Sequence, residues 1–157
     1  MGKKYKSLLL VFSLILVFVF TACSSDKAVT LEKFEKRAHS YGYAVWHCED
    51  DYTEDPTVTD FAVAHNEDKS IQIQRFELES ESAAQSFYST NVRQFRTYGS
   101  GSENSNMDMN LVYYQMAADG FVYEACQKGN TCILIMGKSK YRDNAEKFLK
   151  NIGYLPK

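Results

Sequence analysis

Residues 111–136 read LVYYQMAADGFVYEACQKGNTCILIM, three runs of apolar, aromatic and β-branched residues separated by two short polar turns. Runs of this composition favour β-strands, and connections this short allow only antiparallel hairpins. The sequence therefore predicts a three-stranded meander with strands over 111–117, 121–126 and 131–136. The last strand is apolar on both faces, so we expect it in the centre of the sheet.

The chain before this meander shows the same type of pattern. It predicts three more strands, over 43–48, 58–65 and 70–78. Residues 66–69 have the polar turn chemistry of a hairpin between the last two of these strands. The apolar positions of 70–78 change face midway, which predicts a β-bulge near Gln74 and Arg75.

Three segments have the apolar spacing of amphipathic helices. We expect helices over 30–41 and 81–98, and a third from Asp143 to a stop at Gly153. Asn91 lies on the apolar stripe of the second helix, where its amide needs a partner. It would either hydrogen-bond a strand backbone or line a ligand pocket. The glycine- and serine-rich segment 99–110 is expected to be a flexible loop.

The predicted element order is therefore α-βββ-α-βββ-α, which is typical of an α+β fold. A single antiparallel sheet of about five to six strands, with the helices packed on one face, would bury the three helical stripes.

Composition sets further limits. The chain has 157 residues, of which 45% are hydrophobic and 24% charged, proportions that are typical of a globular protein. Lys and Arg total 18 against 20 Asp and Glu, and Lys3, Lys4 and Lys6 lie in the first 22 residues, so the remainder is more acidic than the whole. Without a basic excess to neutralise phosphates, nucleic-acid binding is not expected.

The first 23 residues have the layout of a secretory signal. Three lysines precede an apolar run over 8–20, and the small residues Thr21 and Ala22 lead to Cys23. As a helix, the apolar run would be about 20 Å long, short of the roughly 30 Å hydrocarbon core of a bilayer. The segment therefore favours an export signal over a membrane-spanning anchor.

Phe20-Thr21-Ala22-Cys23 resembles the lipobox of bacterial lipoproteins, with Phe20 where that family usually has Leu. The resemblance implies a signal peptide over 1–22 and a diacylglyceryl group on the sulfur of Cys23. Residues 24–29 have no periodicity, so we expect a lipidated N-terminus and tether over 23–29, and the length of the remainder predicts a single domain over 30–157. The resemblance also implies a location on the extracytoplasmic face of the cell membrane. The body has a hairpin, a serine- and alanine-rich helix start, a tyrosine-rich strand and a final helix end over 148–154 that reads FLKNIGY. In this pattern it is similar to small lipoproteins of Gram-positive anaerobes, a group with no assigned activity.

Cys126 and Cys132 flank the second turn of the meander, and export permits their oxidation. A three-residue loop 128–130 would place them opposite each other and allow a disulfide. A two-residue turn Gly129-Asn130 would instead pair Cys126 with Ile133 and send Cys132 to the other face. The sequence leaves both geometries open.

The sequence contains no familiar catalytic motif: no nucleophile elbow, no phosphate loop and no helical zinc motif. A cysteine hydrolase would need Cys48 beside a histidine. His47 cannot serve, because adjacent residues of a strand point to opposite faces, so the partner would be His39 or His65. Five carboxylates over 49–55 could hold Ca²⁺, although the EF-hand spacing is absent. We predict no catalytic residues, no metal site and no cofactor.

These features favour a binding or accessory module over an enzyme. Tyr113, Tyr114 and Tyr123 lie on adjacent predicted strands, and an uncovered sheet face that carries tyrosines suits contact with a protein, peptide or envelope glycan. The function expected from the sequence is thus a membrane-anchored extracytoplasmic binding lipoprotein that uses a sheet face or the 99–110 loop. The alternative is a small cysteine-dependent hydrolase that uses Cys48 with a distant histidine.

Overall fold

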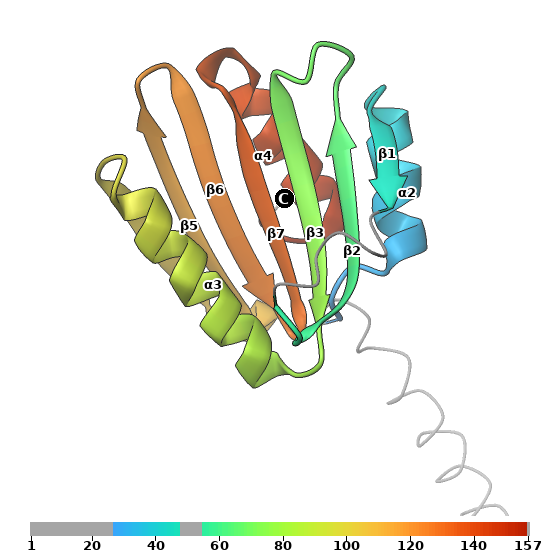
Figure 1. The fold of residues 1–157 in the computed structure, drawn as a ribbon, viewed down its shortest axis with the longest axis vertical. Helices are drawn as coiled ribbons and strands as arrows, with labels where there is room; N and C mark the ends of the chain where they lie inside the picture. The colour runs from blue at the N-terminus through green and yellow to red at the C-terminus, as the bar shows by residue number, and fades with distance from the viewer. Residues whose placement is uncertain (1–26, 48–54, 157) are drawn as a thin grey trace, which may run out of the picture.

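The computed structural model describes residues 27–47 and 55–156, which form one antiparallel sheet with helices on both sides (Figure 1). The strands are β1 (Ala44–His47), β2 (Val58–His65), β3 (Ile71–Leu78), β4 (Gly101–Asn106), β5 (Leu111–Ala118), β6 (Phe121–Lys128) and β7 (Thr131–Lys138). The helices are α2 (Leu31–Ser40), α3 (Glu81–Arg96) and α4 (Arg142–Ile152), with short 3₁₀ turns η1 (Met107–Met109) and η2 (Ser139–Tyr141).

The strand order is β1-β2-β3-β7-β6-β5-β4, which confirms the α+β class. The meander β5-β6-β7 is present, and β7 lies in the middle of the sheet as predicted. Each helix begins and ends within about two residues of its predicted position. Thr30 caps α2 by accepting a hydrogen bond from the Lys33 amide, and Gly153 ends α4 in the left-handed conformation.

The sheet has seven strands in the described residues, not five or six. The extra strand is β4, which lies in the segment predicted to be a flexible loop. It pairs with β5 along its whole length at the edge of the sheet, and its sequence GSENSN is almost entirely exposed. An edge strand that contributes nothing to the core carries no hydrophobic alternation, so its sequence gave no strand signal.

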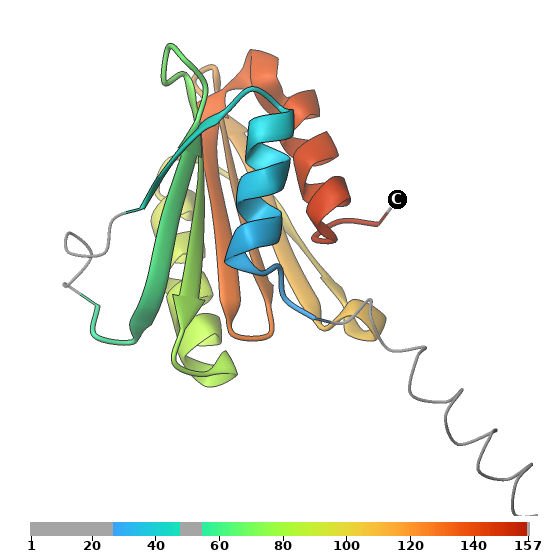
Figure 2. The same cartoon turned by 90° about the vertical axis from the view of Figure 1, so that its right-hand side faces the viewer.

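The prediction that all helices pack on one face is wrong. Helices α2 and α4 cover one face, and α3 lies on the other, which Figure 2 shows from the side. We call these the rear face and the front face. Because β7 is apolar on both of its sides, both faces of the sheet need a cover.

The expected bulge at Gln74 and Arg75 is absent, because β3 pairs with β7 in unbroken register. The apolar positions of β3 change face because both faces are covered: Ile73 is buried on the rear face and Phe76 on the front. The irregularity in this part of the sheet lies instead on β2, between Val58 and Asp60.

The β6–β7 turn consists of Gly129 and Asn130, with a positive φ at Gly129 only, as in a type II′ turn. This register pairs Cys126 with Ile133 and Gln127 with Cys132. The two cysteines therefore point to opposite faces of the sheet, and each is buried and free. Of the two geometries that the sequence allowed, the structure has the one that excludes the disulfide.

Each face has its own apolar core. On the rear face, Phe34 of α2 meets Phe148 of α4 edge to face, with ring centroids 5.7 Å apart. On the front face, Tyr88 and Phe95 of α3 pack on the sheet. None of the helices in the described part of the chain combines the length and apolar character that a membrane crossing needs.

Candidate functional site

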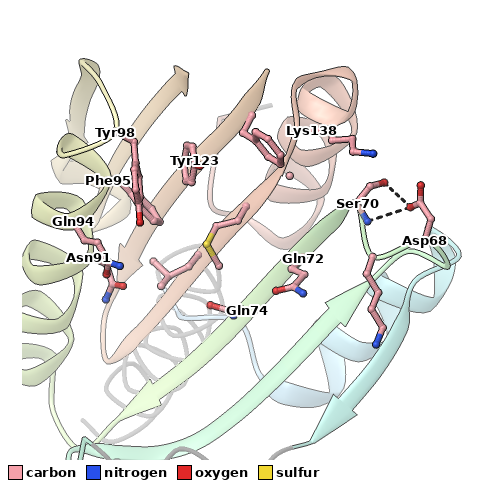
Figure 3. Close-up of a pocket in the computed structure, with 15 residues that line it drawn as sticks. Asp68, Ser70, Gln72, Gln74, Asn91, Gln94, Phe95, Tyr98, Tyr123 and Lys138 are labelled. Carbon is pink, nitrogen blue, oxygen red and sulfur yellow. Dashed lines mark hydrogen bonds between the residues drawn. The ribbon is translucent and has the colours of Figure 1, made fainter. Parts of the chain in front are cut away.

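Helix α3 covers only part of the front face. In Figure 1 it lies in front of the β5–β6 side of the sheet, and its first turns reach the lower end of β3, where Phe87 meets Phe76 with ring centroids 4.6 Å apart. The upper part of β3, and β2 beside it, have no helix in front of them. A cleft of about 610 Å³ opens beside the C-terminal half of α3 (Figure 3). It is bounded by this helix, by strands β3, β6 and β7, and by the β2–β3 turn. This volume lies within the range of small-ligand sites.

Two central strands form the floor of the cleft. Strand alternation places Gln72 and Gln74 of β3 on the front face, beside Leu134 and Met136 of the neighbouring strand β7. The two glutamines are half-buried, so their amides are held at the surface without being sealed from water. The floor therefore alternates between polar and apolar side chains.

Helix α3 supplies one wall. Asn91, Gln94 and Phe95 line the cleft from one side of the helix, and Tyr98 continues that side just beyond its end. Tyr98 is half exposed and stacks on Tyr123 of β6, with ring centroids 5.2 Å apart and an angle of 22° between the ring planes. The ring of Phe95 also packs on the Tyr123 ring, with ring centroids 5.3 Å apart. The wall thus ends in a fixed group of three aromatic rings.

Among the described residues that line the cleft, the charged ones lie at its far rim. Asp68 and Lys69, from the β2–β3 turn, are exposed, as is Lys138 at the end of β7. Asp68 accepts hydrogen bonds from the hydroxyl and backbone amide of Ser70, and these bonds lower the pKa of its carboxyl. The rim therefore carries ionised groups of both signs, and the floor carries none of the charged residue types.

Four side-chain amides face this cleft, those of Gln72, Gln74, Asn91 and Gln94. Asn91 donates a hydrogen bond to the Phe87 carbonyl of its own helix, at 2.9 Å. For the other three, no hydrogen bond to another described residue is present. An amide can donate and accept at once, so the cleft offers several unused donor and acceptor groups to a ligand.

The structure separates the three tyrosines named from the sequence. Tyr123 lines the cleft, whereas Tyr114 is buried under α3 and Tyr113 is buried on the rear face. Asn91 lines the cleft and makes its hydrogen bond within its own helix, so it is not fastened to a strand backbone. The sequence missed Gln72 and Gln74, whose alternation within β3 was the available signal.

Cys48 and the acidic residues 49–54 lie outside the described residues. The three histidines are held in separate places: His39 contacts the Tyr43 carbonyl, His47 pairs with Glu35 of α2 at 2.5 Å, and His65 stacks on Trp46. None of these three lines the cleft. The described residues contain no group of three or more histidine, cysteine or carboxylate side chains placed to share a metal ion.

The two cysteines of the meander are poor nucleophiles. Burial raises the pKa of the Cys132 thiol to about 12 and raises that of Cys126 well above its usual value. Cys132 also donates a hydrogen bond from its sulfur to the Ala84 carbonyl of α3. Because the thiolate is the reactive form, neither group is prepared for catalysis.

The rear face holds a buried carboxyl that the sequence analysis did not single out. Glu124 of β6 is fully buried, and burial together with the nearby Glu146 raises its pKa to about 7. The Gln115 amide lies 3.5 Å from one oxygen of Glu124 and 3.3 Å from Glu146. The other Glu124 oxygen has no partner within the described structure. The sequence signal that could have identified this carboxyl was a glutamate, Glu124, at an inward-facing position of an otherwise apolar strand.

A second buried charge on the rear face fixes the start of the domain. The side chain of Arg75 is 2% exposed and makes ion pairs of 2.6 Å with Asp60 and Glu77. Its Nε donates a hydrogen bond to the carbonyl of Val29, directly before α2. The guanidinium therefore ties the segment that precedes α2 to the centre of the sheet.

Comparison with known proteins adds little. No family model matches the chain, and no curated protein matches it. Among solved structures, the chain is similar to a GTP binding regulator from Thermotoga maritima, at 17% identity over 80% of this chain and 87% of that one, with a TM-score of 0.49. It is also similar to the extracellular domain of PknH from Mycobacterium tuberculosis, at 8% identity over 76% and 67% of the two chains, with a TM-score of 0.34. At these scores neither likeness supports a conclusion about function.

Proposed function

We propose that this protein is a membrane-anchored extracytoplasmic lipoprotein that acts as a binding or accessory module for an envelope component, and that the front-face cleft is its ligand site. The observation that carries the proposal is the cleft itself, a concave surface of about 610 Å³ that α3 leaves open on the front of the sheet. Its aromatic wall and its amides are groups that bind ligands without reacting with them.

The lining of the cleft supports binding over catalysis. Among the described residues, its ionisable side chains are one carboxylate, Asp68, the two lysines of the rim and two tyrosines. Acid–base and nucleophilic mechanisms need a paired base, most often a histidine or a second carboxylate, within hydrogen-bond reach. The cleft offers no such pair, so the hydrolase built on Cys48 stays a prediction without a supporting observation.

The anchor proposed at Cys23 is compatible with the start of the folded domain. Val29 is buried and its carbonyl is held by Arg75, so the fold begins at that point. Only residues 24–28 separate it from Cys23, which limits the tether to less than about 20 Å. A lipid at Cys23 would therefore hold the domain close to the membrane surface.

Two experiments test this proposal. Mass spectrometry of protein purified from membranes should find an N-terminal Cys23 with an added diacylglyceryl group. The Cys23→Ala variant should no longer be found in the membrane fraction. An intact Met1 with an unmodified Cys23 would contradict the anchor.

For the cleft, a photo-crosslinking amino acid is placed at Gln94, on the wall, and in a second variant at Gln85, which is exposed on the same helix away from the cleft. Irradiation of cells should give an adduct with an envelope component at position 94 and not at 85. Equal adducts at both positions, or none at either, would reject the cleft as the ligand site.

A further inference from the structure

We infer that the cleft takes a short, uncharged oligosaccharide, an inference that rests on the proposed function because it names the ligand of the same site. Sugar hydroxyls donate and accept hydrogen bonds, and side-chain amides do the same. Four amides reach the cleft, two from its floor (Gln72 and Gln74) and two from its wall (Asn91 and Gln94). The polar groups of the site thus match a ligand with hydroxyl groups on several sides.

The aromatic group supplies the other half of sugar recognition. A pyranose ring has apolar C–H faces that pack on aromatic rings, and tyrosine adds a hydroxyl at its edge. Tyr98 presents a half-exposed ring, and its stacking on Tyr123 fixes the orientation of that ring. Because the ring is already held in place, little side-chain entropy is lost when a ligand packs against it.

The backbone of the floor argues against a peptide. Peptides that bind to sheets add a strand to an exposed edge, where backbone N–H and C=O groups are free. Strands β3 and β7 are interior strands, each paired on both sides, so their backbone groups are already used. The two edges, β1 and β4, lie at the ends of the sheet. The floor of the cleft therefore offers a ligand its side chains and not a free strand edge.

The charge distribution favours a neutral ligand. The described residues of the floor and the α3 wall include no charged side chain, and the rim has Asp68 beside Lys69 and Lys138. These rim groups are exposed and of mixed sign, so they are screened by solvent and select weakly for charge. A charged group in the amide-lined part of the cleft would lose water without gaining an opposite charge.

The test uses the full chain in micelles of a detergent whose headgroup is not a sugar, so that the headgroup cannot compete. The probes are neutral tetrasaccharides of β-1,4-glucose, β-1,4-N-acetylglucosamine, α-1,4-glucose and mannose, with a tetragalacturonate as the charged comparison. Titration is followed by calorimetry and by saturation transfer from the protein to the sugar. We expect saturable binding of at least one neutral probe, at millimolar Kd or tighter, and weaker binding of the charged one.

Matched variants locate the binding site. Gln94→Ala should weaken binding by several-fold, whereas Gln85→Ala, on the same helix outside the cleft, should leave it unchanged. Tyr98→Ala should weaken binding by about tenfold or more, and Tyr98→Phe, which keeps the ring, should restore most of it. Gln74→Glu should also weaken binding, because it brings a charge to the neutral floor.

The outcomes separate this inference from the proposed function. If no neutral probe binds while the crosslinker at position 94 still captures a protein or peptide, the carbohydrate inference is wrong and the binding function stands. If no sugar probe binds and the crosslinker at position 94 forms no adduct, the carbohydrate inference and the proposed binding function are both wrong. If sugars bind but the Gln94 and Gln85 variants behave alike, the inferred site is wrong.

Discussion

The rear and front faces of the sheet are closed in different ways. On the rear, α2 and α4 together cover the central strands. The buried Arg75 there is paired with two carboxylates, and burial raises the pKa of Glu124 to about 7. On the front, α3 alone covers one side, and the half-buried amides of β3 border an open cleft. One helix is too narrow for a sheet of this width. The difference shows how incomplete cover of a sheet can leave a cleft open to solvent.

The comparison is tested most directly on β7, where Ile135 and Met136 are neighbours that point to opposite faces. Ile135 is fully buried in the rear core, so Ile135→Ala should lower the free energy of unfolding by about 4 kcal/mol. Met136 lines the cleft, so Met136→Ala should lower the free energy of unfolding by about 1 kcal/mol, because solvent already reaches this side chain. Denaturation of the full chain in detergent, followed by circular dichroism, measures both. Equal losses would mean that the cleft is closed.

The Arg75 cluster should give the next largest effect. The double change Asp60→Asn and Glu77→Gln removes both counter-charges and leaves a buried guanidinium uncompensated, at a cost of about 3 kcal/mol. The control is Glu103→Gln in the exposed Arg96–Glu103 pair near α3, which should cost less than about 1 kcal/mol. Melting temperatures should fall by roughly 10 °C for the double variant. A smaller loss than the control would contradict the anchoring role of Arg75.

Glu124 predicts a pH dependence of stability. Its carboxyl keeps its proton in the folded protein up to a pKa of about 7 but loses it near 4.5 when unfolded. The stability that it contributes is therefore complete below about pH 4.5 and declines as the pH rises to 7, by about 3 kcal/mol. Glu124→Gln should remove this decline and be more stable than wild type at pH 8. Parallel stability curves for the two proteins from pH 4.5 to 8 would contradict the raised pKa.

The smallest effect is expected at Asn91 on the front face. Within the described structure its amide bonds the Phe87 carbonyl one turn earlier in α3 and no other group, so Asn91→Ala should change the free energy of unfolding by less than about 1 kcal/mol. A loss of several kcal/mol would show that this amide fastens the core, as one interpretation of the sequence held. Thermal unfolding of the full chain, with and without Asn91→Ala, measures this loss.

Much of the fold could be predicted because its signals are local. Turn chemistry identified the hairpins of the meander, where Asp119 and Gly120 both adopt positive φ. Apolar periodicity identified all three helices of the described structure. Strand β4 could not be found in this way, because a polar edge strand is held by its backbone pairing with β5 and by contacts such as that between Glu103 and Tyr88 of α3.

The candidate site was predictable only in part. Tyr123 and Asn91 stood out by residue type and position, and both reach the cleft. Gln72 and Gln74 did not, since an alternating glutamine on a strand is common on any solvated sheet face. They became candidates only when the path of α3 showed which part of the face stays open.

By itself, the sequence determined the helices and every described strand except β4, because propensity, period and turn chemistry depend on residues close together in the chain. Only the tertiary structure decided which face each helix covers, how Cys126 and Cys132 are oriented and where the cleft opens. These features depend on contacts between distant residues, such as the bond from Cys132 to Ala84, whose free energy is absent until the sheet and helices have packed.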